Sequence, residues 1–156
     1  MIRPGRPEDA NAIAAIWNPL IRETTVTFTT QEKTAGDIAD LLKRQPVFVA
    51  IPNDQIAGFA TYGPFRPGPG YAHTAEHSIY LAAHARGNGL GRALMVRLET
   101  HARDQGLHVM VAGLSGDNKG AITFHTAMGY TEIGHLPRVG RKFDRWHDLV
   151  LMQKCL

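Results

Sequence analysis

The spacing of apolar residues in the first 45 positions predicts two helices after a short strand at Ile2-Arg3. Pro7-Glu8-Asp9 begins the first helix, because proline and acidic side chains suit a first helical turn. The second helix runs from about Lys33 to Arg44, and Pro46 ends it. Between them, the threonine-rich stretch 24–30 predicts an extended segment or a loop. The positions expected to face the core recur at helical spacing: Ile13, Ile16, Trp17 and Leu20, then Ile38, Leu41 and Leu42.

Short apolar runs in the middle of the chain predict buried strands. Val47 to Ile51 and Ile56 to Tyr62 are expected to form an antiparallel hairpin across the turn Pro52-Asn53-Asp54. The stretch from Gly63 to Gly70 holds three prolines and three glycines, so it is expected to be a surface loop. A further strand ends at about Ala83.

The second half of the chain alternates helices and strands in the same way. A helix from about Gly89 to Asp104 is followed by a strand from His108 to Leu114, and the next helix closes at Gly129. Tyr130 to Leu136 and Lys142 to Lys154 predict two final strands. The residues expected to pack in these elements are Leu90, Leu94, Leu98 and Ala102, and later Trp146, Leu149 and Leu151.

This order of elements predicts one domain over residues 1–156, of the α+β or three-layer α/β class, with a mixed, centrally antiparallel sheet flanked by helices. The net charge of +3 comes without a block of like charges, which favours a small anionic ligand over nucleic acid. The one cysteine, Cys155, excludes an internal disulfide and suits a reducing compartment. With no long apolar run and no signal-peptide pattern, we expect a cytoplasmic chain without a membrane partner.

A glycine-rich stretch lies between the strand that ends near Ala83 and the helix that follows. Such a turn gathers backbone N–H groups at the positive end of a helix dipole, so it should hold a phosphate or pyrophosphate. It lacks the Gly-Lys-Ser/Thr ending of a P-loop and the third glycine of a dinucleotide fingerprint. A purely structural turn is the alternative. The residues are Arg86, Gly87, Asn88, Gly89, Leu90, Gly91 and Arg92.

Four blocks of sequence carry a family resemblance, at 66–81, 86–91, 108–130 and 139–149. Together they resemble the GNAT superfamily of N-acetyltransferases over essentially the whole chain. The Arg-x-x-Gly-x-Gly turn is common to the superfamily, whereas the first and last blocks resemble its phosphinothricin / methionine sulfoximine acetyltransferase branch. The resemblance implies acetyl-CoA as co-substrate, no metal, and a homodimer, since the segment Val139 to Leu149 is a C-terminal signature of a branch that usually dimerises.

The resemblance also assigns residues to the cofactor. In the family, the strand before the glycine turn separates from its neighbour and pairs with the pantetheine arm, a position that Ile79 and Leu81 occupy here. The backbone N–H of Leu81 is expected to polarise the thioester carbonyl. Asn118 matches an asparagine that binds the cofactor arm. A helix N-cap is its alternative role, and the two roles can coexist.

Two residues match catalytic positions of the branch. Glu76 falls where the branch has its proposed general base, and a carboxylate there would remove the proton that keeps an amine from attacking a thioester. A solvated strand-end glutamate is the alternative. His125 shares a helix face with Asn118 and stands where most of the superfamily has a tyrosine that protonates the departing thiolate. A packed, hydrogen-bonded histidine is the alternative.

The acceptor is implied by loop residues. Arg66 and Tyr71 match positions that hold an amino-acid substrate in the family, and an arginine fork suits a carboxylate or phosphinate. Phe28 is expected either to wall the acceptor pocket or to pack in the core. Gly68 and Ala72 replace an aromatic residue and an arginine of the family, which puts the choice of acceptor in doubt. Direct acetylation of phosphinothricin, methionine sulfoximine or methionine sulfone is the implied reaction.

Three other readings compete. His73-Thr74-Ala75-Glu76-His77 fits the H-x-x-E-H pattern of a zinc metallopeptidase, but that pattern binds metal only on a helix. On a strand the two histidines would lie about 13 Å apart, too far to share one ion. The chain could instead be a cofactor-binding sensor without chemistry. It could also acetylate a protein N-terminus or lysine. An open acidic acceptor groove would favour that alternative, whereas a narrow pocket would favour a free amino acid.

Overall fold

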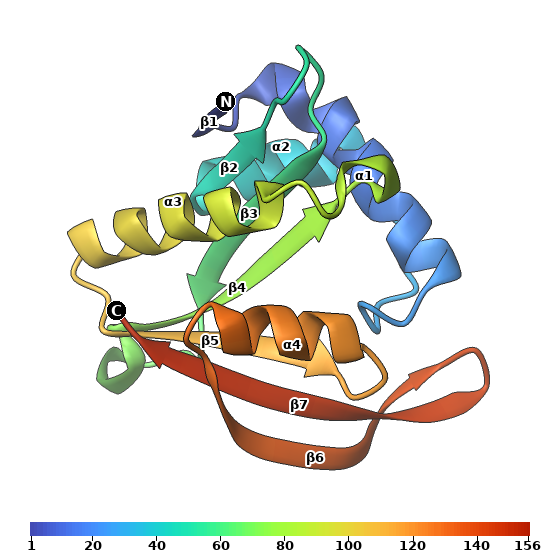
Figure 1. Ribbon diagram of the computed structural model, residues 1–156, viewed down its shortest axis with the longest axis vertical. Helices are drawn as coiled ribbons and strands as arrows, with labels where there is room; N and C mark the ends of the chain where they lie inside the picture. The colour runs from blue at the N-terminus through green and yellow to red at the C-terminus, as the bar shows by residue number, and fades with distance from the viewer.

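The computed structural model describes all 156 residues, and it consists of one seven-stranded sheet between two layers of helices (Figure 1). The strands are β1 (Ile2–Pro4), β2 (Val47–Ala50), β3 (Gly58–Pro64), β4 (Thr74–Leu81), β5 (Val109–Ser115), β6 (Thr131–Lys142) and β7 (Arg145–Cys155). The helices are α1 (Ala10–Glu23), α2 (Ala35–Arg44), α3 (Leu90–Asp104) and α4 (Lys119–Ala127). Single 3-10 turns lie at Pro7–Asp9, Pro69–Tyr71 and Ala83–Ala85. None of the helices is both long and apolar enough to cross a membrane.

The sheet has the order β1-β2-β3-β4-β5-β7-β6, and every neighbouring pair is antiparallel except β4 with β5. Helices α3 and α4 cover one face, and α1 and α2 cover the other (Figure 1). Side chains that alternate along each strand therefore enter two different cores. Phe59 packs under α1 and α2, while its neighbour Ala60 belongs to the core under α3.

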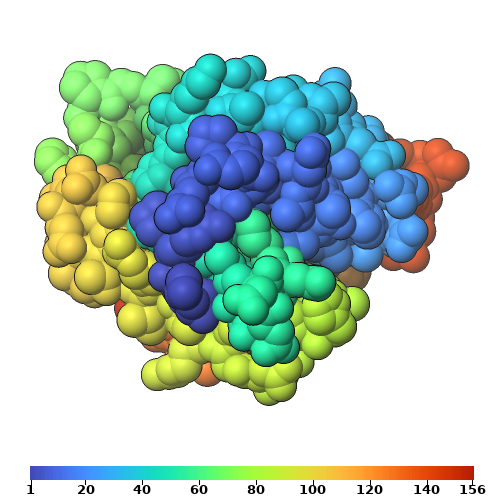
Figure 2. Space-filling view, turned by 90° about the horizontal axis from the view of Figure 1, so that it is seen from above, coloured from blue at the N-terminus to red at the C-terminus, as the bar shows by residue number.

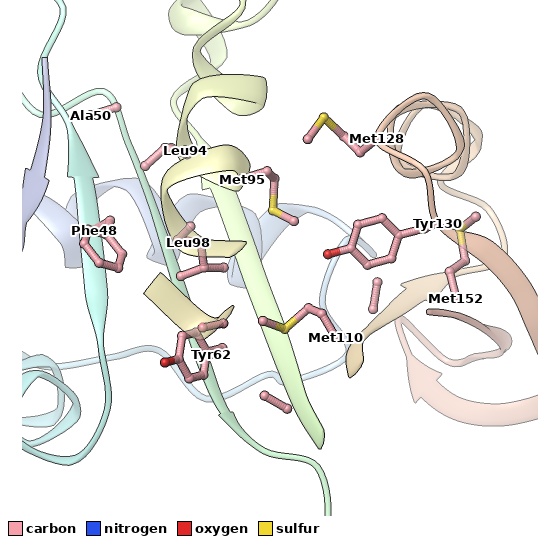
Figure 3. Close-up of a cluster of buried hydrophobic side chains, with 14 of the residues drawn as sticks. Phe48, Ala50, Tyr62, Leu94, Met95, Leu98, Met110, Met128, Tyr130 and Met152 are labelled. Atoms are coloured by element: carbon pink, nitrogen blue, oxygen red, sulfur yellow. The ribbon is translucent and has the colours of Figure 1, made fainter. Parts of the chain in front are cut away.

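The larger core lies between α3 and the sheet and contains 15 buried residues (Figure 3). Leu94, Leu98 and Ala102 of α3 are fully buried in it, as their helical spacing predicts. Tyr130 and Met152 extend the same core toward α4. This packing fixes α3, and with it the glycine turn at its N-terminus, against the middle strands.

The only parallel pair in the sheet is short. β4 and β5 pair from Thr74 with Val109 to His77 with Ala112, after which β4 continues to Leu81 and β5 to Ser115 without pairing with each other. On its other edge β4 stays paired with β3 up to Leu81. The two strands therefore separate in the centre of the sheet, and one edge of β4 is left without a strand neighbour.

The last hairpin differs from the prediction. Lys142 ends β6 instead of beginning the final strand, because Phe143 and Asp144 form the turn with φ of 55° and 57°, the left-handed values that tight hairpins need. Trp146 was expected to pack, but 52% of it is exposed. The fully buried positions of β7 are His147, Val150 and Met152.

Other boundaries move by one or two residues. α2 begins after Thr34, not at Lys33, because the Thr34 hydroxyl accepts a hydrogen bond from the Asp37 N–H and the Asp37 carboxylate accepts one from the Thr34 N–H. The stretch 24–30 contains no strand and is a loop. α4 ends at Ala127 with Met128 as its C-cap, and Gly129 follows the cap with φ of 93°, as predicted for the residue that closes this helix.

Candidate active site

A cavity of about 430 Å³ occupies the gap where β4 and β5 separate. Its walls come from both strands, from α1 and the loop after it, from the glycine turn and from α4. The residues that line it are Leu20, Val26, His77, Ser78, Ile79, Tyr80, Leu81, Arg86, Gly87, Gly91, Ala112, Gly113, Leu114, Asn118, Gly120, Ala121, Phe124 and His125.

The cavity reaches both faces of the sheet. His77, Ile79 and Leu81 point toward the α3 and α4 face, whereas Ser78 and Tyr80 alternate with them and point toward α1. The lining includes α4 residues on one side and Leu20 and Val26 on the other. A ligand on the α4 face can therefore meet a second ligand on the α1 face through the gap between the strands.

The glycine turn is built to present backbone N–H groups. Gly87 and Gly89 have φ of 80° and 75°, a region that L side chains rarely adopt. The N–H of Ala93 makes the first bond of α3, to the carbonyl of Gly89, so the three N–H groups before it have no helical partner. A turn of this kind fits a diphosphate.

The structure does not bring all seven turn residues into the cavity. Arg86, Gly87 and Gly91 line it, whereas Asn88 and Leu90 line a separate depression beside Pro52 and Asn53. Gly89 and Arg92 line neither. A Cβ on Gly91 would lie 3.4 Å from the Phe124 ring, so this glycine lets α3 approach α4.

The other predicted cofactor residues meet at the cavity. Ile79 and Leu81 lie on the edge of β4 that has no strand partner, where an extended ligand could pair with the backbone. Asn118 is the N-cap of α4, and its side chain accepts a hydrogen bond from the Ala121 N–H at 3.1 Å. It also lines the cavity, so its two predicted roles are compatible.

Glu76 lies beside the point where the strands part. It shares the face of Ser78 and Tyr80, and its carboxylate lies over Gly113, where a Cβ would come within 2.9 Å of Oε2. Glu76 does not itself line the cavity, but Gly113, Ser78 and Tyr80 do. Glu76 is exposed overall, as the solvated alternative expects, but partial desolvation of its carboxyl raises the pKa of that group above its ordinary value. A carboxylate with a raised pKa is a stronger base.

His125 is buried and contacts a second histidine that the sequence analysis did not assign to catalysis. His125 Nδ1 lies 2.7 Å from the Ala121 carbonyl, and its Nε2 lies 3.0 Å from Nε2 of His77. His77 Nδ1 lies 3.1 Å from the Val111 carbonyl. Because carbonyl oxygens only accept, both Nδ1 atoms act as donors when all contacts are made, and one further hydrogen lies between the two Nε2 atoms. That form of the pair carries one positive charge.

Burial opposes this charged form. Desolvation, with the neighbouring His125 second, lowers the pKa of His77 to about 3, and desolvation also lowers the pKa of His125. Tyr130 packs against both rings, and its hydroxyl donates to the Glu99 carboxylate, which also accepts from Lys154 Nζ at 2.6 Å. The pair therefore favours its neutral form, in which two hydrogens serve three contacts, so one contact, to a carbonyl or between the two Nε2 atoms, lacks a hydrogen.

Three predicted acceptor residues lie outside the cavity. Arg66 and Tyr71 belong to the loop between β3 and β4, at the end of β4 opposite to the glycine turn, and both pack on the Phe65 ring. Phe28 stacks on His147 with ring centroids 5.6 Å apart. Their contact with an acceptor remains a prediction.

The wall of the cavity on the α1 side consists of Leu20, Val26 and Tyr80, and none of the three was predicted to be a site residue. Tyr80 could have been found, because strand alternation places it on the side of Glu76. Nothing local to Leu20 or Val26 indicates their position, since α1 reaches the cavity only through tertiary packing.

The metallopeptidase pattern lies on a strand and not on a helix. β4 begins at Thr74, so His73 precedes the strand and His77 is within it. Both ring nitrogens of His77 contact protein atoms. No group of three or more His, Cys, Asp or Glu side chains in the structure could hold a metal ion.

Comparison with known proteins decides the family. The model of the acetyltransferase (GNAT) family matches residues 13–130. The chain belongs to this family. It is 39% identical to the L-amino acid N-acyltransferase MnaT of Escherichia coli, over 97% of this chain and 91% of that protein. It is 38% identical to the L-methionine sulfoximine/L-methionine sulfone acetyltransferase of Salmonella typhimurium, over 97% and 92% of the two chains.

A solved structure agrees with these relatives. The GNAT superfamily phosphinothricin acetyltransferase from Sinorhizobium meliloti, in complex with acetyl-CoA, superimposes with a TM-score of 0.95 at 27% identity, covering 100% of this chain and 88% of that one. The predicted resemblance and fold class are therefore confirmed. The protein is a GNAT N-acetyltransferase that uses acetyl-CoA.

Proposed function

We propose that this acetyltransferase moves the acetyl group directly from acetyl-CoA to the α-amino group of a small amino acid or an analogue of the methionine sulfoximine, methionine sulfone or phosphinothricin type. The observation that carries the proposal is the cavity through the sheet, with the glycine turn at one end and Glu76 beside the other. Its limited volume and its apolar wall at Leu20 and Val26 suit a small free acceptor better than a protein segment.

In the proposed mechanism, Glu76 takes one proton from the acceptor's ammonium group, and the neutral amine attacks the thioester carbonyl carbon. The N–H of Leu81 stabilises the oxyanion as the C–N bond forms and the C–S bond breaks. As the amide forms, its nitrogen releases the second amine proton, which passes through solvent to the neutral His125–His77 pair. The pair then gives one proton to the departing thiolate and is neutral again, and Glu76 returns its own proton to solvent when the products leave.

An acceptor panel tests this proposal. We expect release of the CoA thiol with at least one of the three analogues or with an L-amino acid, and the same rate in the presence of a metal chelator. The measurement is a thiol-release assay across the twenty amino acids and the three analogues. A matched peptide with a free N-terminus serves as the control. Acetylation of the peptide alone would favour a protein acceptor and contradict the proposal.

We also propose a homodimer. Val139, Phe143 and Trp146 are about half exposed around the tip of the β6–β7 hairpin, with Ile133 and Leu136 exposed farther along β6. Clustered exposed apolar side chains mark an association surface. Light scattering should give twice the 17.1 kDa chain mass, and Trp146→Asp should shift the protein toward the monomer. A wild-type monomer at micromolar concentration would contradict the proposal.

A further inference from the structure

Lys142 is a buried lysine without a carboxylate partner. It lies near the end of β6 and is 3% exposed. Its Nζ donates to the carbonyl of Thr24 at 2.6 Å and to the carbonyl of Thr27 at 2.8 Å. Burial lowers the pKa of this ammonium group. A buried charge is costly unless its hydrogen bonds are made, so Lys142 holds the two loop carbonyls firmly.

The same loop is fixed at a second point by Phe28. The Phe28 ring stacks on His147 and occupies the space over Gly140, where a Cβ would lie 2.5 Å from a ring carbon. His147 is itself held, because its Nε2 contacts the Lys142 carbonyl at 2.9 Å. In Figure 2 the hairpin end, in red and orange, emerges next to the blue segment that follows α1. We name residues 24–28 the docked loop.

The docked loop forms part of the cavity wall. Val26 lies between the two carbonyls that Lys142 holds, and it lines the cavity. The Thr27 side chain lies near the phenol of Tyr80, which also lines the cavity. Tyr80 shares the strand face of Glu76. The contacts thus run from Lys142 through the docked loop to the acceptor side of the site, while Lys142 itself lines no part of the cavity.

We propose that Lys142 is a positioning residue for the acceptor: it sets the acceptor-side wall by holding the docked loop, and it has no part in binding acetyl-CoA. The proposal rests on the proposed function only for the identity of the acceptor. No hydrogen bond joins the Lys142 ammonium group to the glycine turn or to Asn118, so its removal should leave the donor side of the cavity in place.

Lys142→Met tests the proposal, because methionine keeps much of the length and apolar stem but removes the donors. We expect kcat/KM for the acceptor to fall about 10- to 100-fold, as displacement of a positioning wall does, mainly through a higher acceptor KM. The Kd of acetyl-CoA, measured by calorimetry, should not change. Amide hydrogen exchange should become faster at residues 24–28 and stay the same in α3. Lys43→Met, at an exposed position of α2, is the matched control and should change none of these.

Two results would overturn the proposal: unchanged acceptor KM and unchanged exchange at 24–28, or a parallel loss of acceptor and acetyl-CoA binding. If Lys142→Met does not fold, Gly140→Ala displaces Phe28 and leaves the lysine intact. This variant should also raise the acceptor KM without changing the Kd of acetyl-CoA. Hydrogen exchange and acetyl-CoA binding need no acceptor. An enzyme that acetylates no compound in the panel would contradict the proposed function, while these two readouts would still decide the role of Lys142.

Discussion

Replacing Glu76 by glutamine should lower kcat for acetyl transfer by about 100- to 10,000-fold, the usual contribution of a general base. Glutamine has nearly the same shape but cannot accept the ammonium proton. The Kd of acetyl-CoA should not change, because the Glu76 carboxylate lies on the α1 face beside Gly113 and away from the glycine turn. Steady-state kinetics with a competent acceptor and calorimetry with acetyl-CoA measure the two quantities.

The matched control is Glu8→Gln, at an exposed position of the first turn, which should leave the rate unchanged. A Glu76→Gln enzyme that turns over at the wild-type rate would remove Glu76 from the mechanism. Full loss of acetyl-CoA binding would instead mean that Glu76 has a structural role.

The pH dependence of the wild type gives a second readout of the same residue. Partial desolvation raises the pKa of the Glu76 carboxyl above the ordinary 4.5 of a glutamate. The active form is the carboxylate, so kcat/KM should fall as the pH drops through the raised pKa, and this limb should lie above pH 4.5. The limb should be absent from the residual activity of Glu76→Gln. If the acidic limb were unchanged in Glu76→Gln, the group that titrates there would not be Glu76.

Gly89→Val should weaken acetyl-CoA binding on the order of 10- to 100-fold. Gly89 has φ of 75°, and a β-branched residue there costs about 1–3 kcal/mol of strain. The turn would relax toward negative φ and direct its N–H groups away from the diphosphate. Calorimetric titration with acetyl-CoA measures the change, and thermal unfolding measures the strain.

Gly106→Val is the control for that strain. Gly106 has φ of 83° just beyond the other end of α3, and it does not line the cavity. Both variants should unfold at lower temperature than the wild type, but only Gly89→Val should lose affinity for acetyl-CoA. Equal affinities in the two variants would show that the turn does not hold the diphosphate.

The features that were predictable from sequence are those set by neighbours in the chain. The apolar spacing of α3, the glycine turn before it and the N-cap at Asn118 each depend on a few consecutive residues, and the structure shows all three. The predicted cofactor residues are features of this kind, which is why they could be named in advance, and their contact with acetyl-CoA stays a prediction.

The rest of the candidate site depends on contacts between distant segments. Lys142 meets Thr24 across 118 positions, and His77 meets His125 across 48. No local pattern encodes these pairs, so Phe28 could be named but its contact with Gly140 could not. Trp146 was misplaced for a related reason: the register of β7 is set by its pairing with β5 and β6, not by its own alternation.

The alternation of β4 has a consequence for how this enzyme can vary. Glu76 and His77 are consecutive, so they lie on opposite faces of the sheet, one beside the α1 side of the cavity and one against His125. Deleting or inserting one residue within the paired segment of β4 would exchange the two faces and bring the carboxylate to the core under α4. Length changes between relatives should therefore gather in the loop before Thr74, and none should fall between Thr74 and Leu81.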